Sequence, residues 1–274
     1  MHEMTQEDAA RALLAWYAEM GVDEAVADSP SDFFAWAPPA VSMQASPAPR
    51  PAPPKRAPAP VVSIAPAPLV AADEAIKAAE AAARAASSFE ALAAAVAAFE
   101  GCSLKAGARM TVFSDGVPGA DLLVIGEAPG REEDMTGKPF VGRAGQLLDR
   151  MLAAIGRSRT TNTLISNVIY WRPPGNRTPT QIEMAICRPF VERLIELTEP
   201  KAALLAGGAA MQAMLGVSGI MRARGIWREI ETASGYKVPA LPVFHPAFLL
   251  RSPAQKRHAW ADLLALDERL KSAG

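Results

Sequence analysis

The sequence predicts an α/β protein, a three-layer α/β/α sandwich in which helices cover both faces of a mostly parallel central sheet. Two observations carry this prediction. Through residues 101–274, short apolar runs alternate with longer helix-forming segments, an alternation that is typical of parallel strands joined by helices. The chain of 274 residues is also long enough to bury a sizeable core in one or two domains.

Each apolar run in that segment is interpreted as a strand, and each longer run as a helix. Strands are expected at residues 120–125, 164–170, 202–206 and 239–244, and helices at 142–155, 179–197, 209–215 and from about residue 252. The carboxyl ends of parallel strands meet in one crevice. We therefore expect functional side chains directly after each strand.

The front of the chain differs in composition from the rest. Residues 1–37 are expected to contain a short amphipathic helix at 5–20. Residues 38–72 hold 11 prolines mixed with alanine, which predicts a disordered, semi-extended linker that cannot pack a core.

The functional domain is expected at residues 73–274. Its first part, 73–100, is rich in alanine and predicts two short helices interrupted at Ser87 and Ser88. These helices are expected to lead into the strand-and-helix segment and to cap it.

The net charge of −1 conceals an asymmetry. Residues 1–100 hold 6 Lys and Arg against 13 Asp and Glu, a net charge of −7, whereas residues 101–274 hold 22 against 16, a net charge of +6. A basic half favours a nucleic-acid partner, although charge alone fits an ordinary solvated surface equally well.

Cysteine content and hydropathy restrict the compartment. Two cysteines, Cys102 and Cys187, exclude a disulfide framework and suit a reducing environment. No run of 18 apolar residues is present, and the acidic first residues lack the order of a signal peptide. We expect a soluble cytoplasmic protein, monomeric and without a membrane partner.

Polar side chains follow the expected strands. Glu127 and Glu133 lie around a glycine-rich turn that matches neither a dinucleotide nor a phosphate-loop motif, and on spacing alone an acidic helix start is the plainer interpretation. Asn167 is an amide in an apolar strand and must find hydrogen-bond partners. His245 ends the last strand, where a core histidine is the plainer interpretation, because no second ligand stands at metal-binding spacing.

Three motifs occur at these strand ends in a fixed order. They are GEAPG-x-x-ED-x-x-G-x-PFVG-x-AGQLLD, N-V-x-x-x-RPPGNR-x-P and HPA-x-LLR. Together they resemble the type-4 uracil-DNA glycosylases and the related type-5 enzymes, from about Gly101 to the final helix. The resemblance implies an α/β/α enzyme that flips uracil out of DNA and hydrolyses its N-glycosidic bond, leaving an abasic site at the start of base-excision repair.

The resemblance also implies a role for individual residues. His245 is expected to donate to uracil O2, and one acid, Glu133 rather than Glu127, to position the attacking water or stabilise the electrophilic sugar. Phe140 is expected to stack on the base and Asn167 to read its N3/O4 edge. The expected uracil-binding residues are Ala128, Phe140, Asn167 and His245, and the expected DNA contacts are Arg172, Arg177, Leu249, Leu250 and Arg251.

The sequence departs from the resembled family at the iron–sulfur site, for which the resemblance implies four cysteines. Cys102 and Cys187 match the second and fourth of them, but Phe99 and Trp171 stand at the first and third. A [4Fe–4S] cluster needs four thiolates. We therefore expect no cluster, no other metal and no nucleotide cofactor.

The expected partner is uracil-containing DNA, and residues 1–72 are expected to recruit a repair or replication protein. The alternative function is a protein that binds uracil or abasic sites in DNA with weak or no turnover. The presence of Glu133, Asn167 and His245 argues against that alternative.

Overall fold

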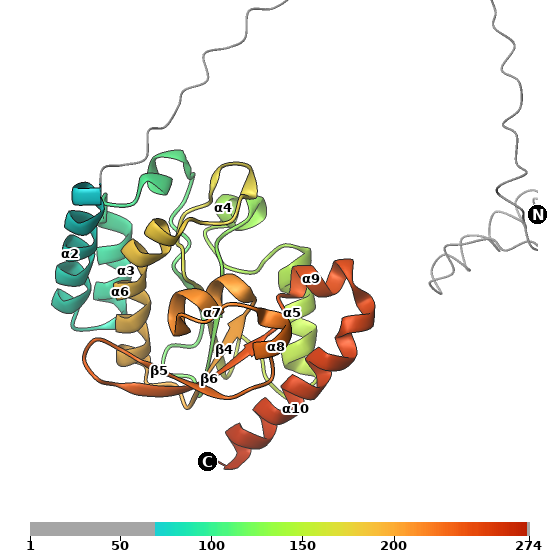
Figure 1. Ribbon diagram of the computed structural model, residues 1–274. Helices are drawn as coiled ribbons and strands as arrows, with labels where there is room; N and C mark the ends of the chain where they lie inside the picture. The colour runs from blue at the N-terminus through green and yellow to red at the C-terminus, as the bar shows by residue number, and fades with distance from the viewer. Residues whose placement is uncertain (1–68, 273–274) are drawn as a thin grey trace, which may run out of the picture. The chain divides into compact units, whose positions relative to one another are not determined.

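One six-stranded sheet organises residues 69–272, the part of the chain that the structure describes (Figure 1). This structure is a computed structural model. Its strands lie in the order β1-β3-β2-β4-β6-β5. The four central strands are parallel: β3 (Thr163–Asn167), β2 (Leu122–Gly126), β4 (Ala202–Ala206) and β6 (Lys237–Val243). The mostly parallel sheet predicted from the sequence is confirmed.

The central strands are apolar on both sides because both faces of the sheet are covered. Successive residues of β2 alternate between two cores. Leu122 and Val124 belong to one cluster of buried side chains, and Leu123 and Ile125 belong to the other. Each face of the sheet therefore needs its own layer of helices, which gives the three layers of the sandwich.

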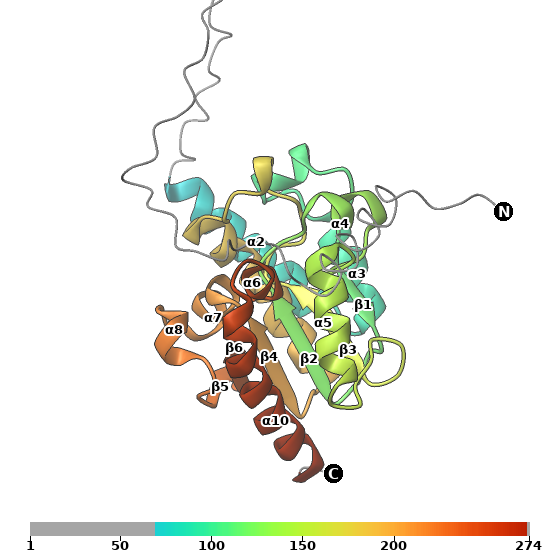
Figure 2. The same ribbon diagram turned by 90° about the vertical axis from the view of Figure 1, so that its right-hand side faces the viewer.

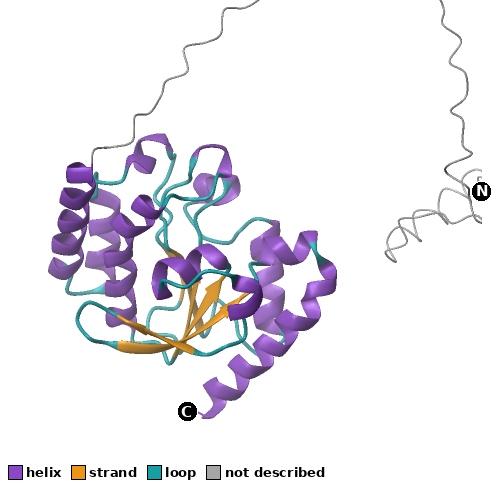
Figure 3. Cartoon of the chain, viewed as in Figure 1, coloured by secondary structure: helices purple, strands orange, loops and turns teal. Residues whose placement is uncertain are grey.

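The helices divide between the two faces as the two cores require (Figures 2 and 3). Helices that contribute to the core of Leu123 and Ile125 are α2 (Leu69–Ala85), α3 (Phe89–Ala98), α6 (Gln181–Thr198) and α7 (Gly208–Leu215). Helices that contribute to the core of Leu122 and Val124 are α5 (Arg143–Ala153), α9 (Pro246–Arg251) and α10 (Lys256–Ser272). The shorter elements are α4 (Arg131–Thr136), α8 (Ile220–Ala223) and the 3-10 turns η1 (Ser103–Gly107), η2 (Pro174–Asn176) and η3 (Pro253–Gln255).

Two edge strands were not expected from the sequence. β1 (Ser114–Gly116) pairs antiparallel with β3, and β5 (Arg228–Glu231) pairs antiparallel with β6. Both are short and mostly polar, β1 being partly buried and β5 largely exposed, so neither carries the apolar run by which the central strands were predicted. Edge positions favour such short, polar strands because a long apolar edge invites aggregation.

The expected strand over residues 164–170 ends earlier, at Asn167. The next residues stay buried beside β2, where Val168 N–H donates to the Gly126 carbonyl (2.9 Å) and Ile169 N–H to the Glu127 carbonyl (3.1 Å). Their apolar character therefore reflects burial in a loop. This loop carries the chain from the strand end to the RPPGNR segment.

The front of the chain is only partly described. Helices α2 and α3 lie on either side of Ser87 and Ser88, as predicted, and α2 begins at Leu69, ahead of the expected start. The expected helix at 5–20 and nearly all of the expected linker lie outside the described residues. Within residues 69–272, no helix is both long and apolar enough to span a bilayer.

Candidate active site

A pocket of about 570 Å³ opens at the carboxyl ends of the central strands. Glu127 follows β2, Asn167 ends β3, and His245 follows β6 by two residues. The residues that line the pocket are Glu127, Ala128, Pro129, Gly130, Arg131, Glu132, Glu133, Phe140, Gly142, Arg143, Ala144, Asn167, Pro173, Asn176, Arg177, His245, Ala247 and Arg251. The structure thus brings together the three strand ends that the sequence singled out.

Asn167 presents an amide to this pocket. Its residue is 2% exposed, and no hydrogen bond among residues 69–272 involves its side chain. The buried side-chain atoms without a partner within residues 69–272 belong to Thr163 and Tyr170, so the Asn167 amide opens into the pocket that it lines. A ligand that offers one acceptor and one donor at this point would match the amide.

Phe140 forms one wall of the pocket. Its ring stacks on the His245 imidazole, with centroids 5.6 Å apart and an interplanar angle of 26°. Its backbone φ of 53° is unusual for a residue with a side chain and costs on the order of 1–3 kcal/mol. A Cβ on Gly126 would overlap both the Phe140 ring and Asn167 Oδ1, and a Cβ on Gly145 would overlap the Phe140 carbonyl.

The proton on His245 can be located from its hydrogen bond. Nδ1 accepts from the Ala247 amide (3.1 Å) as the N-cap of α9, so the neutral ring carries its hydrogen on Nε2. Burial lowers the pKa of His245 to about 4, and the Arg251 charge adds to this effect while Glu133 opposes it. The pocket therefore holds a neutral imidazole that donates through Nε2.

The two acids of the first motif differ in their surroundings. Burial raises the pKa of Glu127, and a hydrogen bond with Thr178 offsets part of the rise. Glu133 accepts three backbone hydrogen bonds, from Gly130 to Oε2 (3.0 Å) and from Val141 and Gly142 to Oε1 (3.0 Å each). Glu133 therefore holds the backbone around the pocket, a structural role that was not predicted from the sequence.

The expected DNA-contact residues occupy different positions around this pocket. Arg177 and Arg251 line it, and the Arg177 guanidinium forms a two-point ion pair with Glu183 (2.6 and 2.9 Å). Arg172 is not among the lining residues, and its Nε donates to Asn176 Oδ1 (2.7 Å). Leu249, a residue of α9, is 1% exposed and packs in the core. Its neighbour Leu250 is only partly buried, so the two leucines of this turn differ in exposure.

The corner where the resemblance implies a cluster holds two thiols and two aromatic rings. Cys102 and Cys187 are buried and free, and the hydrogen bond with the Cys102 side chain, together with burial, raises the pKa of Cys187 well above its ordinary value. The Phe99 and Trp171 rings stack 6.5 Å apart at 27°, and Trp171 Nε1 donates to Thr111 (3.0 Å). Two thiolates in the whole chain do not fit a cluster that needs four.

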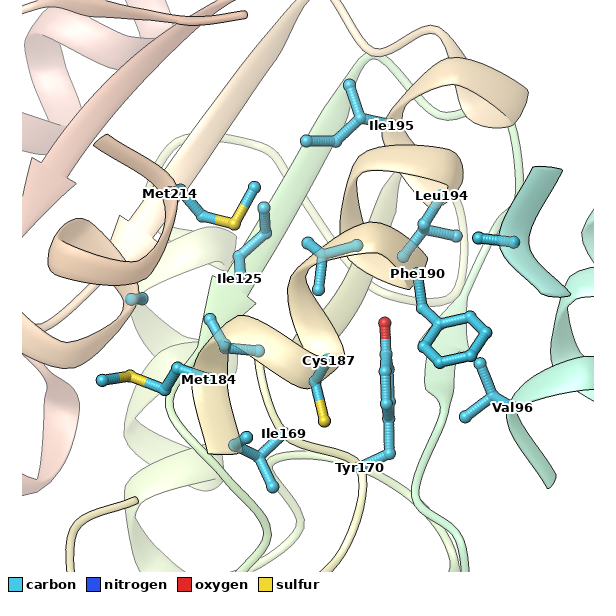
Figure 4. Packing of buried hydrophobic residues seen from close by; sticks show 14 of the residues in the cluster. Val96, Ile125, Ile169, Tyr170, Met184, Cys187, Phe190, Leu194, Ile195 and Met214 are labelled. Carbon is cyan, nitrogen blue, oxygen red and sulfur yellow. The ribbon is translucent and has the colours of Figure 1, made fainter. Parts of the chain in front are cut away.

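The rest of this corner is closely packed. Phe99 meets Phe190 edge to face, with centroids 5.0 Å apart. Figure 4 shows Tyr170 with Cys187 on one side and Phe190 on the other. Within residues 69–272, no group of three or more His, Cys, Asp and Glu side chains is placed to hold a metal ion.

Some pocket residues were not singled out from the sequence. Arg131, Arg143 and Asn176 line the mouth of the pocket, and Arg159 holds the backbone of Phe140 from behind (2.8 Å). The mouth residues lie inside the motifs and could have been chosen for their position. Arg159 lies in a loop after α5 without any local pattern that marks it.

An aromatic ring, an amide and a neutral imidazole thus line one pocket at the carboxyl ends of parallel strands in an α/β fold. The chain belongs to the uracil DNA glycosylase superfamily, whose family model matches residues 113–264. That match spans more than half of the 274 residues.

Curated relatives agree with this assignment. The type-4 uracil-DNA glycosylase of Archaeoglobus fulgidus is 37% identical over 154 residues, which cover 54% of this chain and 76% of the relative. That of Thermotoga maritima is 37% identical over 151 residues, covering 55% of this chain and 77% of the relative. That of Saccharolobus solfataricus is 32% identical over 179 residues, covering 62% and 81% respectively.

Proposed function

We propose that this protein excises uracil from DNA by hydrolysing the N-glycosidic bond and leaves an abasic site, the first step of base-excision repair. The observation that carries this function is one pocket in which a stacking ring, an unpartnered amide, a neutral imidazole and two carboxylates converge. A duplex hides the glycosidic bond, so the uracil nucleotide must be flipped into such a pocket before chemistry.

Base recognition is assigned to Phe140 and Asn167. The Phe140 ring offers an aromatic face against which the flipped base stacks. The Asn167 amide donates to uracil O4 and accepts from N3–H, whereas cytosine presents the opposite pattern at these two atoms. Ala128 lines the same pocket, and its small side chain leaves room for the base.

His245 is proposed to stabilise the leaving group. As the C1′–N1 bond breaks, both electrons of the bond leave with the base, and negative charge develops on uracil O2. A neutral imidazole that donates its Nε2–H to uracil O2 stabilises this developing negative charge by a hydrogen bond. The low pKa of His245, about 4, supports this role, because the imidazole is neutral at physiological pH.

The carboxylates are proposed to act on the other side of the bond. The sugar becomes electrophilic at C1′, where the oxygen of a water molecule forms the new bond, and the proton released from that water neutralises the uracil anion. The three backbone hydrogen bonds of Glu133 favour Glu127 as the acid that positions the water. Glu133 then contributes its negative charge and fixes the loop that carries Phe140.

The DNA backbone is proposed to contact the arginines at the mouth of the pocket. Arg251 and Arg177 line it, and Arg172 lies on the same RPPGNR segment as Arg177. Leu250 stands next to Arg251 on α9, where it can fill the gap that the flipped nucleotide leaves. Leu249 supports this turn from the core.

We propose that the enzyme works without an iron–sulfur cluster, because aromatic rings occupy two of the four ligand positions and pack against each other. We further propose a monomer that acts in the cytoplasm, where it associates with nucleoid DNA. Residues 1–72 are proposed to recruit a repair or replication protein, which co-purification with these residues as bait would test.

The decisive experiment is single-turnover cleavage of labelled oligonucleotides in excess enzyme. We expect release of free uracil from single- or double-stranded DNA that contains one uracil, with EDTA present, and no release from the matched thymine oligonucleotide. A folded preparation that binds both strand forms without releasing uracil would favour the alternative, a binding protein with weak or no turnover.

A further inference from the structure

Arg159 lies behind the pocket with its guanidinium fully engaged. Nη1 donates to the Pro139 carbonyl (3.0 Å) and Nη2 to the Phe140 carbonyl (2.8 Å). Asp115 on β1 accepts from Nη1 (3.0 Å), and Asp149 on α5 accepts from Nε (2.9 Å). The side chain is only 14% exposed, so it is placed to hold backbone and not to contact DNA.

Glu133 holds the same loop by accepting hydrogen bonds from its backbone amides. Where Arg159 donates to the carbonyls of Pro139 and Phe140, Glu133 accepts from the amides of Val141 and Gly142 (3.0 Å each). Four consecutive residues, 139–142, are therefore fixed through their backbone by one cation and one anion that are both partly buried. Lys138, just before them, pairs with the same Asp115 (3.1 Å).

The loop needs such partners because it belongs to no helix or strand. Its polar backbone groups have no ladder of regular hydrogen bonds to satisfy them. At its centre Phe140 has φ of 53°, a conformation that persists only when the surroundings enforce it. Gly145 must lack a side chain to make room for the Phe140 carbonyl that Arg159 binds.

We propose that Arg159 is a positioning residue for uracil excision: by holding the carbonyls of Pro139 and of Phe140, whose backbone is strained, it fixes the ring on which the flipped base stacks. The expected effect on the excision rate rests on the proposed function, whereas the fixing of the backbone at residues 139–142 does not. Displacement of a substrate-positioning group by about 1 Å can cost on the order of 100-fold in rate.

Arg157 supplies a matched control in the same loop. Its side chain is 13% exposed, its Nη1 lies 3.8 Å from Asp121, and neither residue lines the pocket. Arg159→Met and Arg157→Met thus remove the same kind of side chain from equally buried sites. Arg159→Lys keeps the charge but loses the fork, and it serves in place of Arg159→Met if that variant fails to unfold cooperatively.

The first measurement is hydrogen exchange of peptides that cover residues 138–145, which requires no activity. We expect Arg159→Met to speed exchange of the Val141 and Gly142 amides at least about 10-fold, Arg159→Lys to have a smaller effect, and Arg157→Met to have none. Unchanged exchange in Arg159→Met overturns the proposal, even if the wild type excises no uracil and the proposed function itself has failed.

The second measurement is a double-mutant cycle on single-turnover excision. We expect Arg159→Met to reduce the rate about 10- to 100-fold in the wild-type background and to have little further effect in a Phe140→Ala background, because Arg159 acts through that ring. Independent, additive losses would mean that Arg159 serves the fold in general. An active wild type with no loss in Arg159→Met would also refute the positioning role while leaving the proposed function intact.

Discussion

His245 and Asn167 present complementary hydrogen-bonding groups to the pocket that both residues line. The Ala247 amide occupies Nδ1 of His245, which leaves Nε2–H as the donor into the pocket. Asn167 is held at the end of β3, opposite Gly126 of β2, and its amide has no partner among the described residues. One residue can thus only donate, whereas the other can both donate and accept.

Truncation of either side chain removes a specific interaction with the base. We expect His245→Ala and Asn167→Ala each to lower single-turnover excision by about 10²–10³-fold, comparable to the loss of one oxyanion donor. Affinity for undamaged DNA should change little, because phosphate contacts dominate that binding. His258→Ala on α10 is the control for loss of an imidazole. A drop in DNA affinity that accounts for the whole loss of excision would show that these residues are structural.

The pH dependence follows from two opposite shifts in pKa. Burial raises the pKa of Glu127 above its ordinary value of 4.5 and lowers that of His245 to about 4. The proposed mechanism uses ionised Glu127 and neutral His245, so we expect acid to inactivate the enzyme through both groups, with Glu127 protonating first. We expect the rate to fall with decreasing pH through a midpoint above 4.5.

The variant Glu127→Gln separates the two groups. It should lower the rate at neutral pH and leave only the acid limb of His245, near pH 4. A midpoint that does not move in Glu127→Gln would exclude Glu127 as the controlling group. Glu133→Gln should then be measured in the same way, since it is the other acid of the motif.

At the scale of elements, the sequence predicts what is apolar and continuous. The four parallel strands and the helices α5, α6, α7 and α10 were predicted because each carries a sustained apolar pattern. The edge strands β1 and β5 and the six-residue helix α9 carry none. The location of the pocket was predictable, because the carboxyl ends of parallel strands lie together. The close approach of the Phe140 ring to Gly126 was not, because Phe140 lies 14 residues further along the chain and outside any helix or strand.

Gly126 sits at the end of β2, where its lack of a side chain makes room for the pocket. Its backbone is not left-handed, so Gly126→Ala is compatible with the strand. The added methyl group would overlap Asn167 Oδ1 and the Phe140 ring and displace both. We expect excision by the folded variant to fall about 100-fold or more, together with a loss of stability of about 1–3 kcal/mol from overpacking.

The control for this change is Gly208→Ala at the start of α7. An added Cβ there would meet Ile220 at 3.8 Å, an ordinary contact, and alanine favours a helix. Gly208→Ala should therefore keep full activity. Equal activity of Gly126→Ala and wild type would mean that the pocket does not hold the base at this point.

At the scale of the whole molecule, the sequence could identify which ligands are missing and which residues replace them, but not how the replacing rings pack. Phe99 and Trp171 lie 72 residues apart and stack only after α3, α6 and the strand-end loop have come together. Arg159 and Asp115 are likewise 44 residues apart. Neither contact leaves a local pattern, because both join segments that meet only in the folded chain.

Ligand counting leads to a test on the intact protein. Protein purified with or without oxygen should be colourless and contain no stoichiometric iron, because the chain has two cysteines and two stacked rings where four thiolates would be needed. The rings also fill the corner with apolar surface, each contributing about 1.5–3 kcal/mol through burial. The double variant Phe99→Cys with Trp171→Cys would restore the four thiols, so iron uptake and broad visible absorbance in that variant alone would show that the corner has kept its shape. About four irons per wild-type chain would contradict the prediction and would require ligands other than the two cysteines.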